Sequence, residues 1–165
     1  MRHFKFINLR LVSIQSLVSK IIGEIGNMSK QIQGSGSCLC GKVSSTVFGP
    51  FQRFYQCYCN RCQKKSGSAF ASLIFTTPDK IEWHSGKEYI KRFDLPQALR
   101  FSNCFCTECG SQVPFVSRDG SLLLIPAGYL NGDPQIKPLA NIFWEDKPCW
   151  YEEGQAAPKF DQYPE

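Results

Sequence analysis

Histidine is scarce in this chain. Only two of the 165 residues, His3 and His84, carry an imidazole, and neither is placed like a catalytic base. The sequence also lacks a Ser-His-Asp set, a phosphate-binding loop and a dinucleotide fingerprint. Hydrolase, nucleotide-dependent and nicotinamide chemistry therefore have no support in the sequence.

Long apolar runs are missing too, which excludes a transmembrane anchor. The net charge of +5 is concentrated in residues 1–33, which hold five Lys or Arg against Glu24, so the rest has 14 basic and 13 acidic side chains. Residues 34–165 therefore carry a formal charge of only +1. We expect no membrane or nucleic acid partner and a cytoplasmic location, with organelle targeting by residues 1–27 left open.

Residues 1–33 differ from the rest because they contain neither cysteine nor proline. Their apolar residues follow helical spacing and predict an amphipathic helix: Ile7, Leu11, Ile14, Val18, Ile21 and Ile25. Three explanations compete, namely a targeting peptide, a surface-associating helix, or an extension upstream of a true start at Met28. We favour the third, and expect an extension over 1–33 and a single domain over 34–165.

Cysteine, in contrast, is abundant. Eight of the nine cysteines form three clusters: Cys38 and Cys40; Cys57, Cys59 and Cys62; and Cys104, Cys106 and Cys109. Eight thiols are enough for two four-sulfur sites, and zinc accepts such ligands in tetrahedral geometry. The odd count, the lack of a secretory signal and the close spacing disfavour disulfides, and ferredoxin spacings are absent.

Short apolar segments separated by Gly and Pro follow Gly34 and predict a small, mainly antiparallel β domain closed by zinc. The expected strands are 42–48, 51–57, 70–76, 81–84, 88–93, 113–116, 122–125 and 142–144. Asp119-Gly120 predicts a type I′ hairpin turn. Within the domain, only Gln63 to Ser66 shows helical potential.

The motifs together resemble the glutathione-dependent formaldehyde-activating (GFA) family, also called the centromere protein V domain, over about residues 35–163. They are Gly36-Ser-Cys38-Leu-Cys40-Gly41, Cys57-Tyr-Cys59-Asn-Arg-Cys62 with Ser66-Gly-Ser68-Ala-Phe70, Phe105-Cys106-Thr-Glu-Cys109-Gly110, Ala127-Gly-Tyr-Leu130, and Ile142-Phe143 with Pro148 and Trp150. Few other families share this order.

The resemblance implies an Mss4-like fold and two zinc ions per chain. It assigns Cys38, Cys40, Cys106 and Cys109 to a structural zinc, and Cys57, Cys59 and Cys62 to a catalytic zinc with an open position. The implied carbon–sulfur lyase reaction joins glutathione and formaldehyde into S-(hydroxymethyl)glutathione. Zinc can hold the glutathione sulfur as a thiolate at neutral pH, so no protein nucleophile is needed.

Two positions depart from the family pattern. Cys104 stands two residues before the Cys106 motif, where it either faces the core as a free thiol or closes the second site as a fourth ligand. A fourth sulfur would make that zinc structural. The other departure is Asn141, where many relatives have His, so proton transfer would depend on water or glutathione.

Side chains beside the second cluster are candidate glutathione contacts. Arg61, Lys64 and Lys65 could receive its carboxylates, although a solvated basic turn is the plainer interpretation. Ser66 and Ser68 could donate hydroxyl hydrogen bonds, or simply form a turn. Cys149 is expected to be a small buried residue, and the aromatics 143, 144, 150 and 151 are expected to form core and lid.

Two hypotheses follow. The first is a GFA-like zinc enzyme or glutathione binder that acts on the glutathione–formaldehyde adduct. The second is a non-catalytic zinc scaffold with two closed four-cysteine sites that serves as a binding module.

Overall fold

The structure is a computed structural model that describes residues 16–19 and 32–164. Its strands are β1 (Ile32–Ser37), β2 (Ser44–Phe48), β3 (Arg53–Cys57), β4 (Ala71–Thr76), β5 (Ile81–Ser85), β6 (Ile90–Asp94), β7 (Ser102–Cys106), β8 (Phe115–Val116), β9 (Leu123–Pro126) and β10 (Ala140–Ile142). Its helices are α2 (Asn60–Ser66) and α3 (Tyr151–Ala156), with 3₁₀ turns at Lys87–Tyr89, Ala127–Tyr129 and Trp144–Asp146.

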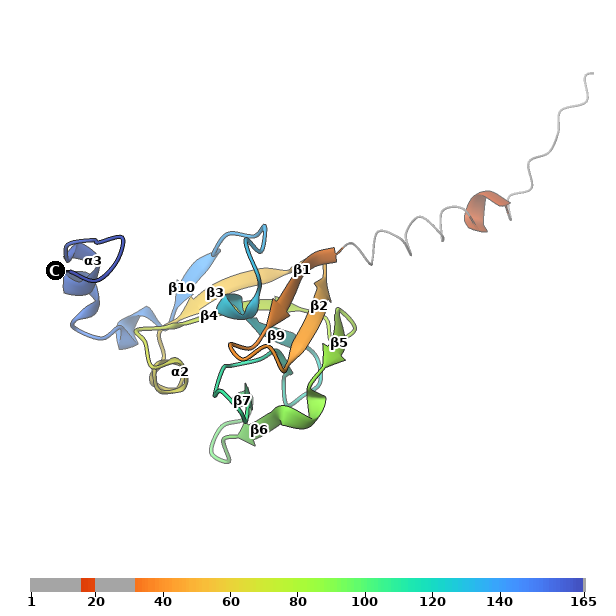
Figure 1. Cartoon of the computed structure of the whole chain (residues 1–165), viewed down its shortest axis with the longest axis horizontal. Helices are drawn as coiled ribbons and strands as arrows, with labels where there is room; N and C mark the ends of the chain where they lie inside the picture. The colour runs from red at the N-terminus through yellow and green to blue at the C-terminus, as the bar shows by residue number, and fades with distance from the viewer. Residues whose placement is uncertain (1–15, 20–31, 165) are drawn as a thin grey trace, which may run out of the picture.

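The strands form three sheets of different size (Figure 1). A five-stranded sheet has the order β10-β3-β4-β9-β8, a three-stranded sheet the order β1-β2-β5, and β6 pairs with β7. All pairs are antiparallel except β10 with β3. The predicted mainly β, mainly antiparallel fold is therefore confirmed.

Most predicted strands are present, with ends shifted by a few residues. Two strands were missed, β1 and β7. β1 is polar and glycine-rich, IQGSGS, so it has no apolar alternation to detect. β7 carries the third cysteine cluster, which we interpreted as a metal-binding turn, although residues 102, 104 and 106 alternate as buried strand positions.

Two helices and one strand differ from the prediction. The predicted helix at Gln63 to Ser66 is the second half of α2, which begins at Asn60. The predicted strand at 142–144 is displaced, because β10 ends at Ile142 and Trp144 begins a 3₁₀ turn. Helix α3 was not predicted. It is short, and all of its residues except Tyr151 are exposed to solvent.

Asp119-Gly120 lies in the hairpin that joins β8 to β9, as predicted. The turn type was wrong, however, because a type I′ turn needs positive φ at both central residues and only Gly120 has it, at φ 74°. The loop closes instead through Ser117, whose N–H donates to the Leu122 carbonyl across 2.8 Å. The Asp119 carboxylate accepts hydrogen bonds from the hydroxyls of Ser117 and Ser121.

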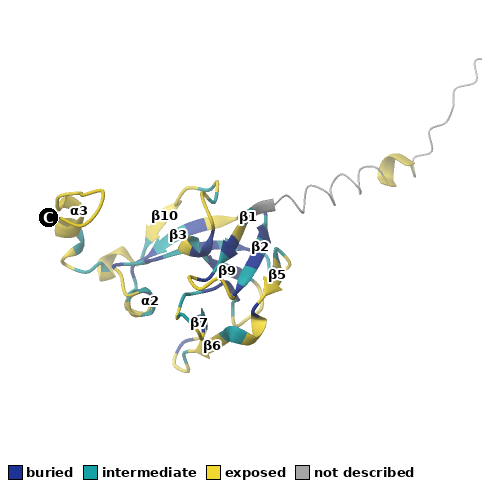
Figure 2. Cartoon of the chain, viewed as in Figure 1, coloured by how far each residue is buried: buried dark blue, intermediate teal, exposed yellow. Residues whose placement is uncertain are grey.

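Burial is concentrated where the sheets meet, and the C-terminal segment is mostly exposed (Figure 2). The main core contains Val43, Ile74, Leu123, Ile125 and other apolar residues of both larger sheets. A smaller cluster is formed by Cys57, Cys62, Ala71 and Leu73. Leu124 packs against both, so the second cysteine group lies on the same framework as the core.

The amphipathic helix predicted within residues 1–33 falls largely outside the described residues. Residues 16–19 are helical, and Leu17 and Val18 are exposed there. Within the described ranges, no helix has the length and apolarity needed to cross a membrane.

Candidate metal and thiol site

The first cysteine group joins two segments that are 66 residues apart in sequence. Cys38 and Cys40 follow β1, whereas Cys106 ends β7 and Cys109 lies in the turn after it. Their four Sγ atoms lie within 4.8 Å of one another, with 3.5 Å between Cys38 and Cys40 and 3.9 Å between Cys40 and Cys106. The topology thus brings together the four residues that the resemblance named.

Two glycine turns shape this group. Gly41 donates its N–H to the Cys38 carbonyl across 2.9 Å, and Gly110 donates to the Cys106 carbonyl across 2.8 Å. Both glycines have positive φ, 75° and 73°, a conformation that side chains disfavour. The turns also orient donors toward sulfur, since the Val43 N–H lies 3.3 Å from Cys38 Sγ.

The second group is built on one continuous segment. Cys57 ends β3, Cys59 stands just before α2, and Cys62 lies within it. Their three Sγ atoms lie within 4.8 Å of one another, with 3.5 Å between Cys57 and Cys59. Cys57 and Cys62 are buried and Cys59 is half-buried.

Cys104 is not among the sulfurs of this second group. It is 5% exposed and belongs to the main core. Burial raises the pKa of its thiol, against the opposing effect of the Arg92 guanidinium. The geometry therefore groups three cysteines, and leaves the fourth position of a tetrahedral metal without a protein sulfur.

The sulfur spacing suits a metal and not a disulfide. A bonded pair of sulfurs is about 2.05 Å apart, whereas tetrahedral zinc with bonds of about 2.3 Å places its sulfurs about 3.8 Å apart. The observed separations of 3.5–3.9 Å match the second value, and all nine cysteines are free thiols. Both groups can therefore hold a metal ion of the kind that prefers thiolate.

Thiolate is favoured at one position of each group. Hydrogen bonding from Cys62, with help from the backbone at Cys59 and the charge of Lys65, lowers the pKa of Cys57 to about 6. Hydrogen bonding with Ser111 lowers the pKa of Cys109 to about 5. Metals bind the deprotonated form, so both groups contain a thiol prepared for coordination.

A small cationic cavity adjoins the second group. It has a volume of about 280 Å³. Its wall combines three cations of α2, namely Arg61, Lys64 and Lys65, with residues of β6, β7 and the loop between them, namely Phe93, Leu95, Phe101 and Asn103. Phe101 also packs against the Cys57–Cys62 cluster. The cavity and the cluster that contains Cys57 and Cys62 therefore share Phe101 as a neighbour.

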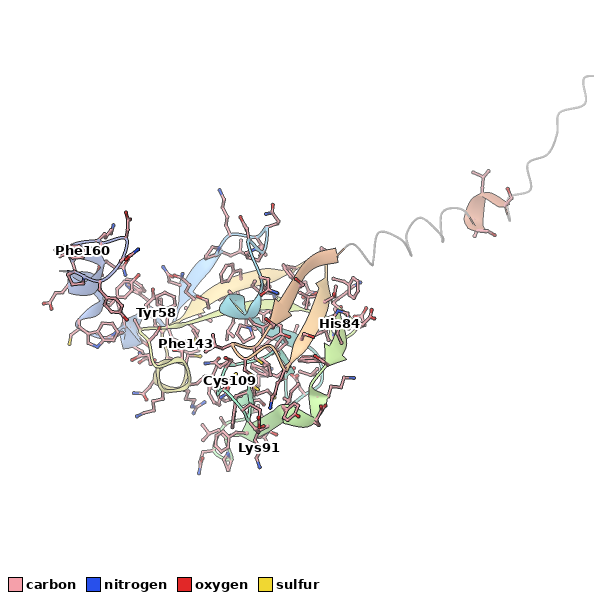
Figure 3. All side chains as sticks on the ribbon, in the orientation of Figure 1. Tyr58, His84, Lys91, Cys109, Phe143 and Phe160 are labelled. Carbon is pink, nitrogen blue, oxygen red and sulfur yellow. The ribbon has the colours of Figure 1, made fainter. Side chains whose placement is uncertain are left out.

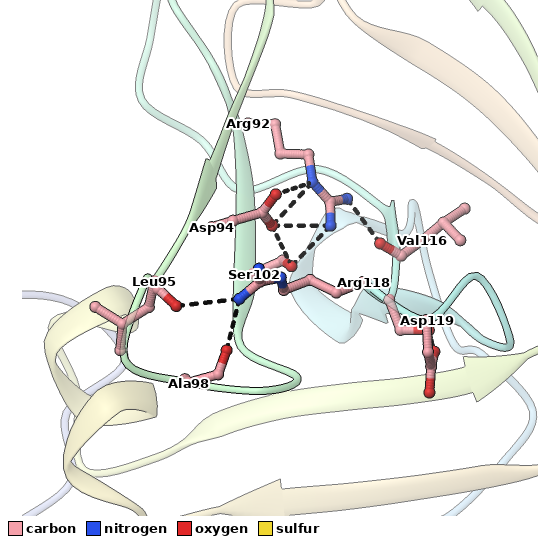
Figure 4. A network of polar contacts seen from close by, with 9 residues as sticks. Arg92, Asp94, Leu95, Ala98, Ser102, Val116, Arg118 and Asp119 are labelled. Carbon is pink, nitrogen blue, oxygen red and sulfur yellow. Dashed lines mark hydrogen bonds and ion pairs between the residues drawn. The ribbon is translucent and has the colours of Figure 1, made fainter.

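An arginine network holds the loop that forms one wall of this cavity (Figure 4). Arg118 donates to the carbonyls of Ala98, at 2.7 Å, and Leu95, at 3.3 Å. Arg92 binds the Asp94 carboxylate at 2.9 Å and donates to the Val116 carbonyl at 2.7 Å. These bonds fix residues 95–101 against the hairpin of β8 and β9.

A larger cavity of about 640 Å³ contains no charged side chain in its wall. Its polar groups come from Ser37, Ser66, Ser72, Ser111, Gln112, Tyr129 and Asn131. The five candidate glutathione contacts are therefore divided. The three cations line the cationic cavity, Ser66 lines the larger one, and Ser68 Oγ donates to the Phe70 carbonyl at 2.8 Å.

The aromatic residues near the C-terminus only partly form a lid. Tyr58 is fully buried between Phe70, Trp144 and Tyr151, with ring centroids 5.0, 4.8 and 5.4 Å away. Phe143 and Trp150 are exposed, contrary to the core role expected of them. Cys149 is also exposed, so its predicted burial was wrong.

His84 lies on β5, well away from Tyr58 and the second cysteine group (Figure 3). It is exposed, and its Nε2 is 2.8 Å from Thr46 Oγ1. Sequence reasoning missed the wall residues Phe93, Leu95, Phe101 and Asn103, because nothing in a single sequence shows that the β6–β7 loop folds against α2. The one signal available in the sequence was the alternation of residues along β7, in which positions 102, 104 and 106 are buried.

The fold and the two groups of clustered thiols define a small β protein whose cysteines could hold metal ions. The chain belongs to the glutathione-dependent formaldehyde-activating enzyme family, whose profile matches residues 33–146. The resemblance drawn from the motifs is thereby confirmed. No curated protein matches the chain.

Among solved structures, the chain resembles a Rhodobacter sphaeroides protein with a TM-score of 0.51 and 18% sequence identity. The match covers 65% of this chain and 98% of the other. At this identity the likeness establishes a shared fold alone.

Proposed function

We propose that this chain is a zinc-dependent carbon–sulfur lyase that joins glutathione and formaldehyde into S-(hydroxymethyl)glutathione, or cleaves that adduct. The observation that carries the proposal is the second cysteine group, which brings three sulfurs together and leaves out Cys104. Zinc bound there by Cys57, Cys59 and Cys62 would accept the substrate sulfur as a thiolate at neutral pH. The other group, Cys38, Cys40, Cys106 and Cys109, would hold a closed structural zinc.

The reaction is a simple addition. The sulfur electron pair forms a bond to the carbonyl carbon of formaldehyde, and the carbonyl oxygen takes up a proton, so no oxidant or reductant is needed. The side chains near the second group that the structure describes include no imidazole, since His84 lies elsewhere. Water would supply the proton, and the protein's contribution is to position the thiol.

The cationic cavity supports glutathione as the thiol. Of the three cations in its wall, Arg61 and Lys64 are exposed and Lys65 is half-buried, and no acidic side chain is part of that wall. Carboxylates bind such cations through charge-assisted hydrogen bonds. Ser66 and Ser68 have weaker support, because both hydroxyls already donate to backbone carbonyls of the chain.

Native mass spectrometry of the zinc-loaded full chain with increasing glutathione tests the proposal. We expect two zinc ions and a saturable glutathione adduct, and no adduct with S-methylglutathione, which keeps the carboxylates but lacks a free thiol. Cys57→Ser should retain one zinc and lose the adduct, while Cys149→Ser, at an exposed position outside both groups, should behave as wild type.

Exchange NMR on glutathione and formaldehyde then separates binding from catalysis. The wild-type protein should accelerate adduct formation, and Cys57→Ser should not. Two zinc ions with no thiol adduct and no acceleration would instead identify a closed, non-catalytic scaffold.

A further inference from the structure

Lys65 differs from its cationic neighbours in where its charge acts. It lies on α2 three residues after Cys62, a spacing that places two side chains on the same face of a helix. Its side chain is half-buried, and its Nζ lies 4.7 Å from the ring centroid of the buried Phe115. Lys64, the adjacent residue, is exposed.

The counter-charge of Lys65 comes from the thiols. None of the ion pairs in the described part of the chain involves Lys65. Burial lowers its pKa, and Cys62, Cys104, Cys57 and Cys59 oppose that effect. A desolvated ammonium without a carboxylate partner is costly, so the cysteine group is its electrostatic partner.

The charge of Lys65 affects which ligand can occupy the fourth coordination position of a metal bound by the second cysteine group. Three thiolates and Zn²⁺ sum to about −1. A neutral fourth ligand leaves that charge unchanged, whereas a thiolate raises it to about −2. A fixed cation at the edge of the group therefore stabilises the anionic complex more than the neutral one, because Coulomb energy scales with the charge it faces.

We propose that Lys65 is the half-buried counter-ion that makes the second cysteine group select an anionic sulfur as its fourth metal ligand. The inference rests on the proposed function, since it assigns the specificity of that same site. Lys65 is a positioning residue that acts on the bound sulfur through the charge of the metal–thiolate complex. Arg61 and Lys64 have a different role, because they would bind the carboxylates of glutathione. The ligand class follows: thiols that bind as thiolates, in preference to neutral nitrogen donors.

The test uses the full chain loaded with cobalt(II), whose visible spectrum reports a new fourth ligand. Two small probes without carboxylates isolate the charge on the ligand atom: 2-mercaptoethanol, which binds as an anion, and imidazole, which binds as a neutral donor. Lys65→Met keeps the size of the side chain and removes the charge. Lys159→Met makes the same charge change at an exposed position outside the cavity and is the matched control.

We expect Lys65→Met to weaken 2-mercaptoethanol binding at pH 7 about tenfold or more, as one nearby charge at intermediate dielectric predicts. Imidazole binding should change less than about twofold, since that ligand brings no charge. The pH at which thiol binding is half-maximal should rise in Lys65→Met. Lys159→Met should leave the binding of both ligands unchanged, and Lys65→Arg, which keeps the charge, should retain most of the thiol affinity.

Two results would overturn the role of Lys65 while the proposed function stands: Lys65→Met binding 2-mercaptoethanol as wild type does, or losing both probes equally. Wild-type protein that binds neither probe would refute the open site itself, and with it both proposals. Metal content of two ions per chain is the check on folding, and Lys65→Gln replaces Lys65→Met if that variant retains fewer.

Discussion

The side-chain amide of Gln112 donates a hydrogen bond to the backbone carbonyl of Lys65 across 2.9 Å. This bond joins the last turn of α2, which follows the second cysteine group, to the segment that follows the first. Residues 47 positions apart in sequence thereby hold the two thiol groups in one framework.

Gln112→Ala is expected to lower the free energy of unfolding by about 1 kcal/mol, because a part-buried carbonyl loses its donor. Denaturant unfolding of the metal-loaded protein measures the change. Gln155→Ala, at an exposed position of α3, is the control and should change stability by less than about 0.5 kcal/mol. Equal effects from both variants would show that the bond to Lys65 adds nothing.

Gly36 allows β1 to pack directly on the ring of Tyr129. A Cβ at this position would lie 2.3 Å from a ring carbon and 2.8 Å from the backbone oxygen of Tyr129, whereas a Cβ at Gly34 would meet nothing within 4 Å. Gly36→Ala should therefore destabilise the protein by about 2 kcal/mol or more through overpacking. Gly34→Ala, in the same strand, should remain within about 0.5 kcal/mol of wild type. Thermal unfolding of the two variants side by side decides the matter.

Removing Cys104 should leave the metal content unchanged. Because its sulfur lies outside both groups, Cys104→Ala is expected to retain two zinc ions per chain, with a loss of stability of about 1–2 kcal/mol from the core cavity. Cys106→Ala should retain one zinc, since it removes a ligand of the first group. Elemental analysis against protein concentration gives the ratio. One zinc in Cys104→Ala would instead make this residue a ligand.

Tyr129 should make stability decrease at alkaline pH. Burial raises the pKa of its hydroxyl above the ordinary value, and the hydroxyl lies 3.0 Å from Ser45 Oγ. The folded state therefore favours neutral tyrosine. Its contribution is complete below the unfolded pKa of about 10, and it is lost as pH rises through the folded pKa, with a slope of up to about 1.4 kcal/mol per pH unit.

Unfolding free energies at pH 8, 10 and 11 test this dependence. The loss above pH 10 should be smaller in Tyr129→Phe, which has no hydroxyl to ionise. Tyr163→Phe provides the control, because Tyr163 is 96% exposed and its substitution should leave the pH profile as in wild type. Identical profiles for Tyr129→Phe and wild type would contradict the prediction.

Cysteine spacing allowed the metal-binding chemistry to be inferred without a structure. Thiols two and three residues apart can reach a shared point, so Cys57, Cys59 and Cys62 formed one predicted group. The same spacing at Cys104, Cys106 and Cys109 brings only the last two together. The alternation of apolar residues likewise indicated most strands. Strands β1 and β7 escaped because one has almost no apolar residues and the other carries ligands.

Only the tertiary structure decided which properties the site has beyond its ligands. The placement of Cys104 in the core, outside the second group, depends on the pairing of β6 with β7, a contact between segments whose pairing no local pattern specifies. The same packing separates Lys65 from Lys64, two identical side chains in sequence, by burying the first against Phe115 and leaving the second in solvent. Local spacing indicates which cysteines can share a metal ion because coordination is short-range. Which of them come together, and the charge and burial around them, depend on the segments that the folded chain brings near.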